Sequence, residues 1–217
     1  MTIKILYAEK RRPELSREAF SRGWRIHAGD AMKCGDFWDP ILFYVQNDAP
    51  ARPTGIAGVD ASYDCVGEVC YATHADCDAS IAAPSLPGIT QDGDHIFSRI
   101  DQISMIAEHR AIIDRRAGDI KLFVFARFGD AADRIAAQTA ALAAGDGDFA
   151  RFIRQAGIAH ALTETPLCDG AIEFAYDTIE EARLGHADWL AHIAPQPLQP
   201  ITIAAHSYIL YDRRNCE

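Results

Sequence analysis

The chain has 217 residues, 49% of them apolar and 24% charged, with a formal net charge of −10. This length suits one large domain or two small ones, and the composition is that of an ordinary soluble globular protein. The acidic charge argues against nucleic acid and anionic membranes as partners, because binding to phosphates depends on a basic surface.

The apolar runs and the cysteines of the sequence indicate the cellular environment of the protein. No apolar run approaches the roughly 20 residues of a membrane-spanning helix, and we expect no secretion signal before the strand-like run at 3–8. The six cysteines follow no metal-binding spacing. We therefore expect free, mostly buried thiols in a reducing, cytoplasmic environment.

The first half of the chain predicts the element order β-α-β-β-α-β. Ser16 is a suitable N-cap, and Glu18 would lie in the first helical turn, where the helix dipole favours a carboxylate. We expect strands at 3–9, 41–47, 65–73 and 103–113, helices at about 16–32 and 74–83, and loops at 35–40, 47–62 and 83–94.

The second half repeats this order. Here we expect strands at 120–126, 157–163, 170–177 and 201–211 and helices at about 131–143 and 179–193. Four residue types recur at identical spacing in the two halves: Asp64, Glu68, Tyr71 and Thr73 against Asp169, Glu173, Tyr176 and Thr178. A repeat of this length indicates one structural unit present twice, and we place the two modules at 1–116 and 117–217.

Each module matches the ferredoxin-like unit, a four-stranded antiparallel sheet covered by helices on one face. The connection at 114–119 is too short for a flexible linker. We therefore expect an α+β protein in which the two bare sheet faces bury each other and form one barrel.

His27 is the first candidate for chemistry. Phe20, Trp24 and His27 recur on one helix face, so the imidazole would point inward beside an indole. Such a histidine can have a pKa near neutrality, as general acid–base catalysis requires. The structural alternative is a core histidine bonded to a backbone carbonyl.

Polar residues on the strands supply further candidates. Alternation places Tyr44 and Gln46 on one sheet face and Asn47 on the other; these groups suit either hydrogen bonding to a phenolate, enolate or carboxylate, or simple cross-strand packing. Glu68 and Glu173 lie in mid-strand, where a buried carboxylate needs a cationic partner. Their repetition favours a structural role.

Several histidines lie elsewhere. His109 and His206 are in the last strand of each half, and His160 lies roughly where the first half has Tyr44. The other histidines are expected on solvated helices or loops: His74, His95, His186 and His192. We find no convincing metal site, phosphate-binding glycine loop or nucleophile elbow.

The first half resembles the EthD-like family of the dimeric α+β barrel superfamily. The residues that carry the resemblance are 10–20, 24–28, 44–47 and 63–71. In the second half it is weaker, because the helix at 131–143 has neither the tryptophan nor the histidine. Asp48 also stands where many relatives would have a histidine. We therefore expect one working pocket, in the first half.

The resemblance implies a cofactor-free pocket for an aromatic or polyketide-like small molecule. We expect first a lyase that decarboxylates a phenolic or aromatic acid, with His27 as acid–base and Tyr44 and Asn47 holding the phenol. Arg11 or Arg25 would orient the carboxylate. Further candidate site residues are Trp24, Trp38, Glu68, His109 and His160.

Two alternatives remain open at this stage. One is a cyclase, dehydratase or cofactor-free oxygenase acting in the same pocket; the other is a non-catalytic binding or accessory protein. The fold does not choose among them. The sequence also leaves open whether the protein pairs into a homodimer.

Overall fold

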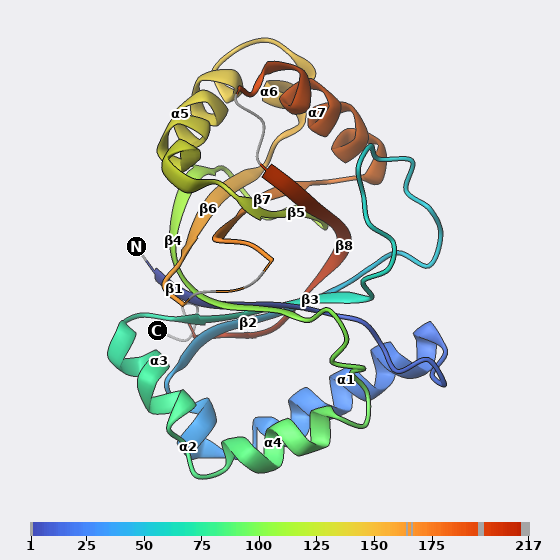
Figure 1. Ribbon diagram of the computed structural model, residues 1–217, viewed down its shortest axis with the longest axis vertical. Coiled ribbons are helices and arrows are strands. Elements are labelled where there is room, and N and C mark those ends of the chain that lie inside the picture. The colour runs from blue at the N-terminus through green and yellow to red at the C-terminus, as the bar shows by residue number, and fades with distance from the viewer. Residues whose placement is uncertain (1, 164, 166, 195–197, 214–217) are drawn as a thin grey trace.

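Eight antiparallel strands close into one barrel in the computed structural model, which describes residues 2–163, 165, 167–194 and 198–213 (Figure 1). The strands are β1 (Thr2–Glu9), β2 (Ile41–Asp48), β3 (Cys65–Tyr71), β4 (Ile103–Asp114), β5 (Ile120–Arg127), β6 (Gln155–Ala161), β7 (Gly170–Tyr176) and β8 (Leu198–Asp212). Their order around the barrel is β1-β3-β2-β8-β5-β7-β6-β4. The expected α+β barrel is confirmed.

The helices form two layers outside the barrel (Figure 1). The first half contributes α1 (Arg17–Ala31), α2 (Gly35–Trp38), α3 (His74–Ile81) and α4 (Leu86–Gly93). The second half contributes the 3-10 helix η1 (Gly129–Ala131) and the helices α5 (Ala132–Ala143), α6 (Asp148–Phe152) and α7 (Ile179–His192). The sheets of the two halves are also joined at their edges, because β2 pairs with β8 and β4 pairs with β6.

The repeated residues have matching local roles in the two halves. The Asp64 carboxylate accepts a hydrogen bond from the Arg11 amide after β1, and Asp169 accepts from the amides of Phe128 and Gly129 after β5. Thr73 and Thr178 are the N-caps of α3 and α7. The duplication seen in the sequence is thus a duplication of turns and caps as well as of strands.

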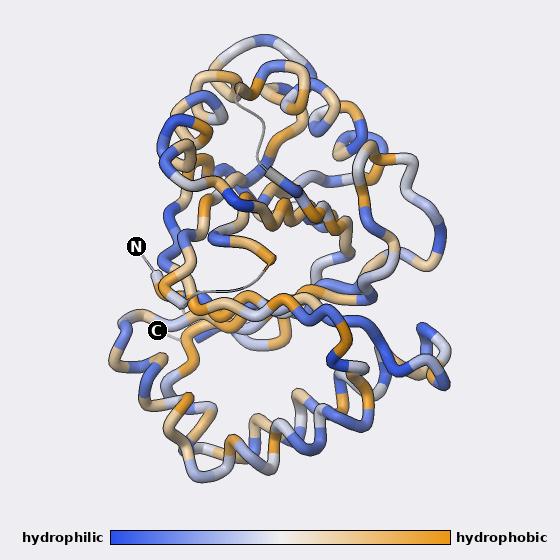
Figure 2. The backbone as a smooth tube through the Cα atoms, in the orientation of Figure 1, coloured by the Kyte–Doolittle hydropathy of each residue, from blue (hydrophilic) through white to orange (hydrophobic). Residues whose placement is uncertain are grey.

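The inward-facing side chains change character along the barrel. One end is filled by an apolar cluster that includes Leu6, Met105, Phe123, Phe125 and Ile203, all at most 1% exposed. Figure 2 shows apolar residues gathered along the central strands and polar ones on the outer turns of the helices. The opposite end of the barrel is hollow, and charged side chains lie among the apolar ones that line it.

Two expected loops contain short helices. The segment 35–40 holds α2, which buries Trp38 against Tyr44, and the segment 83–94 holds α4. The signal for α4 was Pro87, since proline favours the first helical positions. Among the described residues, we find no helix long and apolar enough to cross a membrane.

Candidate functional site

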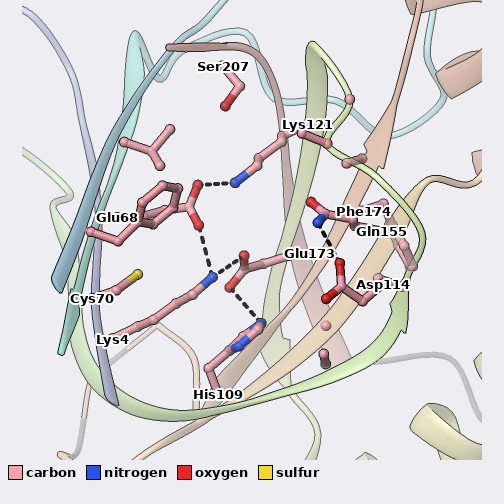
Figure 3. A pocket seen from close by; sticks show the side chains of 18 of the residues that line it. Lys4, Glu68, Cys70, His109, Asp114, Lys121, Gln155, Glu173, Phe174 and Ser207 are labelled. Atoms are coloured by element: carbon pink, nitrogen blue, oxygen red, sulfur yellow. Dashed lines mark hydrogen bonds and ion pairs between the residues drawn. The ribbon is translucent and has the colours of Figure 1, made fainter. Parts of the chain in front are cut away.

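The hollow end of the barrel is a cavity of about 390 Å³, within the usual size of small-molecule sites. Figure 3 shows side chains from β1, β3, β4, β5 and β7 converging on it. Two lysines, two glutamates, a histidine and a cysteine point into this space: Lys4, Glu68, Cys70, His109, Lys121 and Glu173.

The two lysines and two glutamates form a buried ion-pair quartet. Lys4 Nζ lies 2.9 Å from Glu68 Oε2 and 2.6 Å from Glu173 Oε2, and Lys121 Nζ bonds to Glu68 Oε1. Burial opposes the charge on Glu68, but Lys121 and Lys4 outweigh it and hold the pKa of this carboxyl well below its usual value. Burial likewise opposes the Lys4 ammonium, yet Glu173 and Glu68 raise its pKa overall. Glu68 and Lys4 are therefore both charged at neutral pH.

His109 lies beside this quartet. Its Nε2 atom is 3.8 Å from Glu173 Oε1, and that oxygen is buried with no hydrogen-bond partner among the described residues. Burial lowers the pKa of His109, although Glu173 opposes the shift. The imidazole is therefore neutral at pH 7, and Glu173 is placed to stabilise the positive charge of the ring if it becomes protonated.

Other residues of the cavity lining complete the site. Gly157 on β6 leaves room for the ring, because a methyl carbon at that position would lie 2.2 Å from His109 Nε2. Cys70 lies near Lys4, but burial raises the pKa of its thiol to about 12, so it is not a nucleophile at neutral pH. Asp114 and Asp119 stand at the cavity lining on the solvent side, where both are exposed.

Three of the site residues expected from the sequence lie at this cavity or next to it. His109 and Glu68 line it. Asn47 is fully buried beside it and donates from Nδ2 to Glu68 Oε1 at 3.0 Å and to the Val66 carbonyl.

Four other expected residues lie on the opposite face of the β1–β3–β2 sheet or on its rim. Tyr44 shares a hydrogen bond of 2.9 Å with the Tyr7 hydroxyl, and burial raises the pKa of Tyr44 to about 12. Trp24 packs on Tyr7, and Trp38 packs edge-on against Tyr44. Arg25 pairs with Asp48 at 2.6 Å. Tyr44 and Asn47 therefore face opposite sides of β2 and cannot hold one substrate together.

The remaining three are dispersed. His27 on α1 has a 15% exposed side chain, and its Nδ1 lies 2.6 Å from Asp92 Oδ2 on α4, outside the barrel. Arg11 pairs with the buried Asp64. His160 is half-buried on β6, where alternation with the inward-facing Ala159 places it on the outer face.

His186 corrects an expectation, because it is 1% exposed rather than solvated. Its ring stacks on Trp189 at 5.7 Å, and burial lowers the pKa of His186 to about 4. The spacing of Ala182, His186 and Trp189 along one helix face was a signal for this burial.

Four residues that line the cavity were not expected as site residues from the sequence: Lys4, Lys121, Gly157 and Ser207. The two lysines had a signal, since each is the second residue of a repeated strand opening, Ile3-Lys4 and Ile120-Lys121. A buried glutamate needs a cationic partner, and because the glutamate is repeated in both halves, its partner is expected to be repeated as well. Gly157 and Ser207 carried no comparable signal.

No family model matches the chain, and no curated protein matches it. Solved structures do match over nearly the full length. A candidate monooxygenase from Fusobacterium nucleatum has a TM-score of 0.62 at 7% identity, covering 97% of this chain and 93% of that one. An anthrone oxidase-like protein has a TM-score of 0.57 at 12% identity, covering 98% and 94%.

A third match is a mutant chlorite dismutase from Candidatus Nitrospira defluvii, with a TM-score of 0.52 at 11% identity, covering 94% and 91%. These similarities concern the fold, which is a closed eight-stranded antiparallel barrel flanked by helices and formed by one polypeptide. Because the matched proteins differ in activity, the fold alone does not select a reaction. In the described part of the chain, no three His, Cys, Asp or Glu side chains are arranged to hold a metal ion.

Proposed function

We propose that the protein is a cofactor-independent enzyme that removes a proton from a small phenolic or enolisable aromatic compound bound in the barrel cavity. The observation that carries this proposal is His109, a neutral imidazole in the barrel cavity beside a carboxylate oxygen that has no hydrogen-bond partner among the described residues. A buried base of this kind suits general base catalysis near neutral pH.

The cavity residues have different roles in this reaction. With its hydrogen on Nε2, His109 keeps a lone pair on Nδ1 that accepts the substrate proton. The imidazolium so formed is stabilised by Glu173, 3.8 Å away. The ammonium groups of Lys4 and Lys121 face the negative charge that develops on the substrate, and fixed charges of this type lower a barrier without reorganisation.

We propose oxygenation as the overall reaction. An activated methylene beside a carbonyl loses its proton to His109, and the carbanion reduces dioxygen and then combines with it as a hydroperoxide. Loss of water leaves a second carbonyl, so R2CH2 + O2 gives R2CO + H2O without an added reductant. The fold similarity to a candidate monooxygenase and an anthrone oxidase-like protein supports this choice.

Decarboxylation of a phenolic acid is the second candidate, in keeping with the EthD-like resemblance of the first half. It is favoured by the two ammonium groups in the cavity, which suit a carboxylate. The exposed Asp114 and Asp119 at the cavity lining oppose the entry of an anion. We therefore place decarboxylation after oxygenation.

One experiment separates these reactions. Purified protein is offered anthrone and a panel of hydroxybenzoic and hydroxynaphthoic acids, while dioxygen uptake and carbon dioxide release are followed together. We expect uptake of dioxygen with the methylene ketone and its loss in His109→Gln. Carbon dioxide release would indicate the lyase, and binding without turnover would indicate a non-catalytic binding protein.

A further inference from the structure

The barrel has an internal two-fold relationship that passes through the ion-pair quartet. Lys4 on β1 lies opposite Cys70 and Ala107, and Lys121 on β5 lies opposite Ala175 and Ala205. Glu68 and Glu173 are related in the same way on β3 and β7. Each half therefore supplies one lysine and one glutamate from equivalent positions.

The symmetry is broken at the position of His109. Its counterpart on β8 is Ser207. His109 lies opposite Thr2, two residues before Lys4, and the Ser207 amide donates to the carbonyl of Asp119, two residues before Lys121. The space around the ring is asymmetric as well. Gly157 on β6 lies opposite Glu173. The equivalent position, opposite Glu68, is occupied by Val45 on β2. One half of the cavity therefore holds an imidazole, and the other holds a serine hydroxyl.

The half with the serine presents unused hydrogen-bond donors. Ser207 lines the cavity, and within the described residues its hydroxyl has no hydrogen-bond partner (Figure 3). Within the part of the chain that the structure describes, the Lys121 ammonium bonds to Glu68 alone, whereas Lys4 bonds to both glutamates. An ammonium has three donors, so Lys121 has hydrogens left for a molecule in the cavity.

We propose that Ser207 and Lys121 form a subsite that binds an uncharged oxygen of the substrate, a phenol hydroxyl or a ketone carbonyl. This rests on the proposed function and adds how the substrate is oriented. With its oxygen held in this half, the substrate presents its reacting group across the cavity to His109. A carbonyl bound here gains negative charge when the proton leaves, and both donors then strengthen their hold on it.

Ligand binding tests the subsite without knowledge of the natural substrate. The probes are 1-naphthol and naphthalene, which share one ring system and differ by one hydroxyl group, and binding is followed by fluorescence and calorimetry. The variant is Ser207→Ala. The matched control is Ser104→Ala, which removes an exposed serine hydroxyl from β4.

We expect Ser207→Ala to weaken 1-naphthol binding about five- to tenfold, the usual effect of losing one hydrogen bond, and to leave naphthalene binding unchanged. Ser104→Ala should change neither. The subsite is wrong if Ser207→Ala affects both probes equally or neither of them, or if wild-type protein binds neither probe.

Lys121→Gln provides a second variant, with its fold checked by circular dichroism. Lys121 should lower the pKa of bound 1-naphthol relative to free 1-naphthol, and Lys121→Gln should reduce that shift; an unchanged shift contradicts a role for Lys121. Failure of the proposed function can be distinguished from failure of the subsite. If the naphthol effects are present but no compound is turned over, the subsite stands and the enzymatic proposal falls.

Discussion

Gly157 and His109 are matched in shape: a methyl carbon on residue 157 would lie 2.2 Å from the Nε2 atom of His109. Gly157→Ala must therefore displace the imidazole from its place beside Glu173. We expect this substitution to lower kcat/KM at least about tenfold, since small misplacements of catalytic groups are costly. Steady-state kinetics on the compound that the wild type turns over would measure the loss.

Gly29→Ala is the control for that substitution. Gly29 lies in α1, and a methyl group there would meet nothing within 4 Å. We expect unchanged kinetics and a gain of about 0.5 kcal/mol in the free energy of unfolding, because alanine favours a helix over glycine. Equal activity losses in the two variants would show that the fit around His109 is irrelevant.

The pH dependence of activity should follow His109. Burial lowers the pKa of this imidazole below 6.5, and only the neutral ring accepts a proton. The rate kcat/KM should therefore hold through pH 6.5 and fall at lower pH as the ring becomes protonated. An acid limb centred above pH 6.5 would contradict this assignment. Proton NMR of the imidazole, compared between wild type and His109→Gln, would identify the titrating group.

The quartet predicts unequal effects for its two lysines. Glu173 has Lys4 as its one hydrogen-bond donor among the described residues, whereas Glu68 accepts from Lys4, Lys121 and Asn47. Lys4→Met leaves a buried carboxylate without a donor, so we expect a loss of about 3–5 kcal/mol in urea unfolding. Lys121→Met should cost clearly less. The reverse order would show that the pairing has been misassigned.

His186 should make the protein sensitive to acid. Its pKa is about 4 in the folded chain against 6.5 when exposed. Below pH 6.5 the unfolded chain therefore binds a proton that the native one does not, and stability falls as the pH drops towards 4. The full effect is about 3 kcal/mol. His186→Gln should flatten this part of the stability curve, and an unchanged curve would contradict the assignment.

The sequence predicted the barrel because its signals are local. Strand-length apolar runs, the N-cap Ser16 and the repeated Asp, Glu, Tyr and Thr all report on nearby structure. The repeat then implied two copies of one unit, and the short connection at 114–119 implied that they pack together. These signals did not predict the short helices α2 and α4 or the pairing of the sheet edges at β2–β8 and β4–β6.

The site was harder to predict because it depends on which face of a curved sheet each residue occupies. His27 has the aromatic neighbours of a tuned histidine, yet its helix lies outside the barrel and its partner is Asp92. His109 had no such neighbours in sequence. Its setting comes from Gly157 and Glu173, which lie 48 and 64 residues away along the chain. Contacts of this range are fixed by strand register, which one sequence does not specify.

The most direct test compares two histidine variants, His109→Gln and His27→Gln, in dioxygen uptake with the compound that wild-type protein oxidises. We expect His109→Gln to lose at least about 100-fold in rate, the scale of a general base, and His27→Gln to stay within about threefold of wild type. A folded His109→Gln protein with full activity, or a loss confined to His27→Gln, would contradict catalysis inside the barrel.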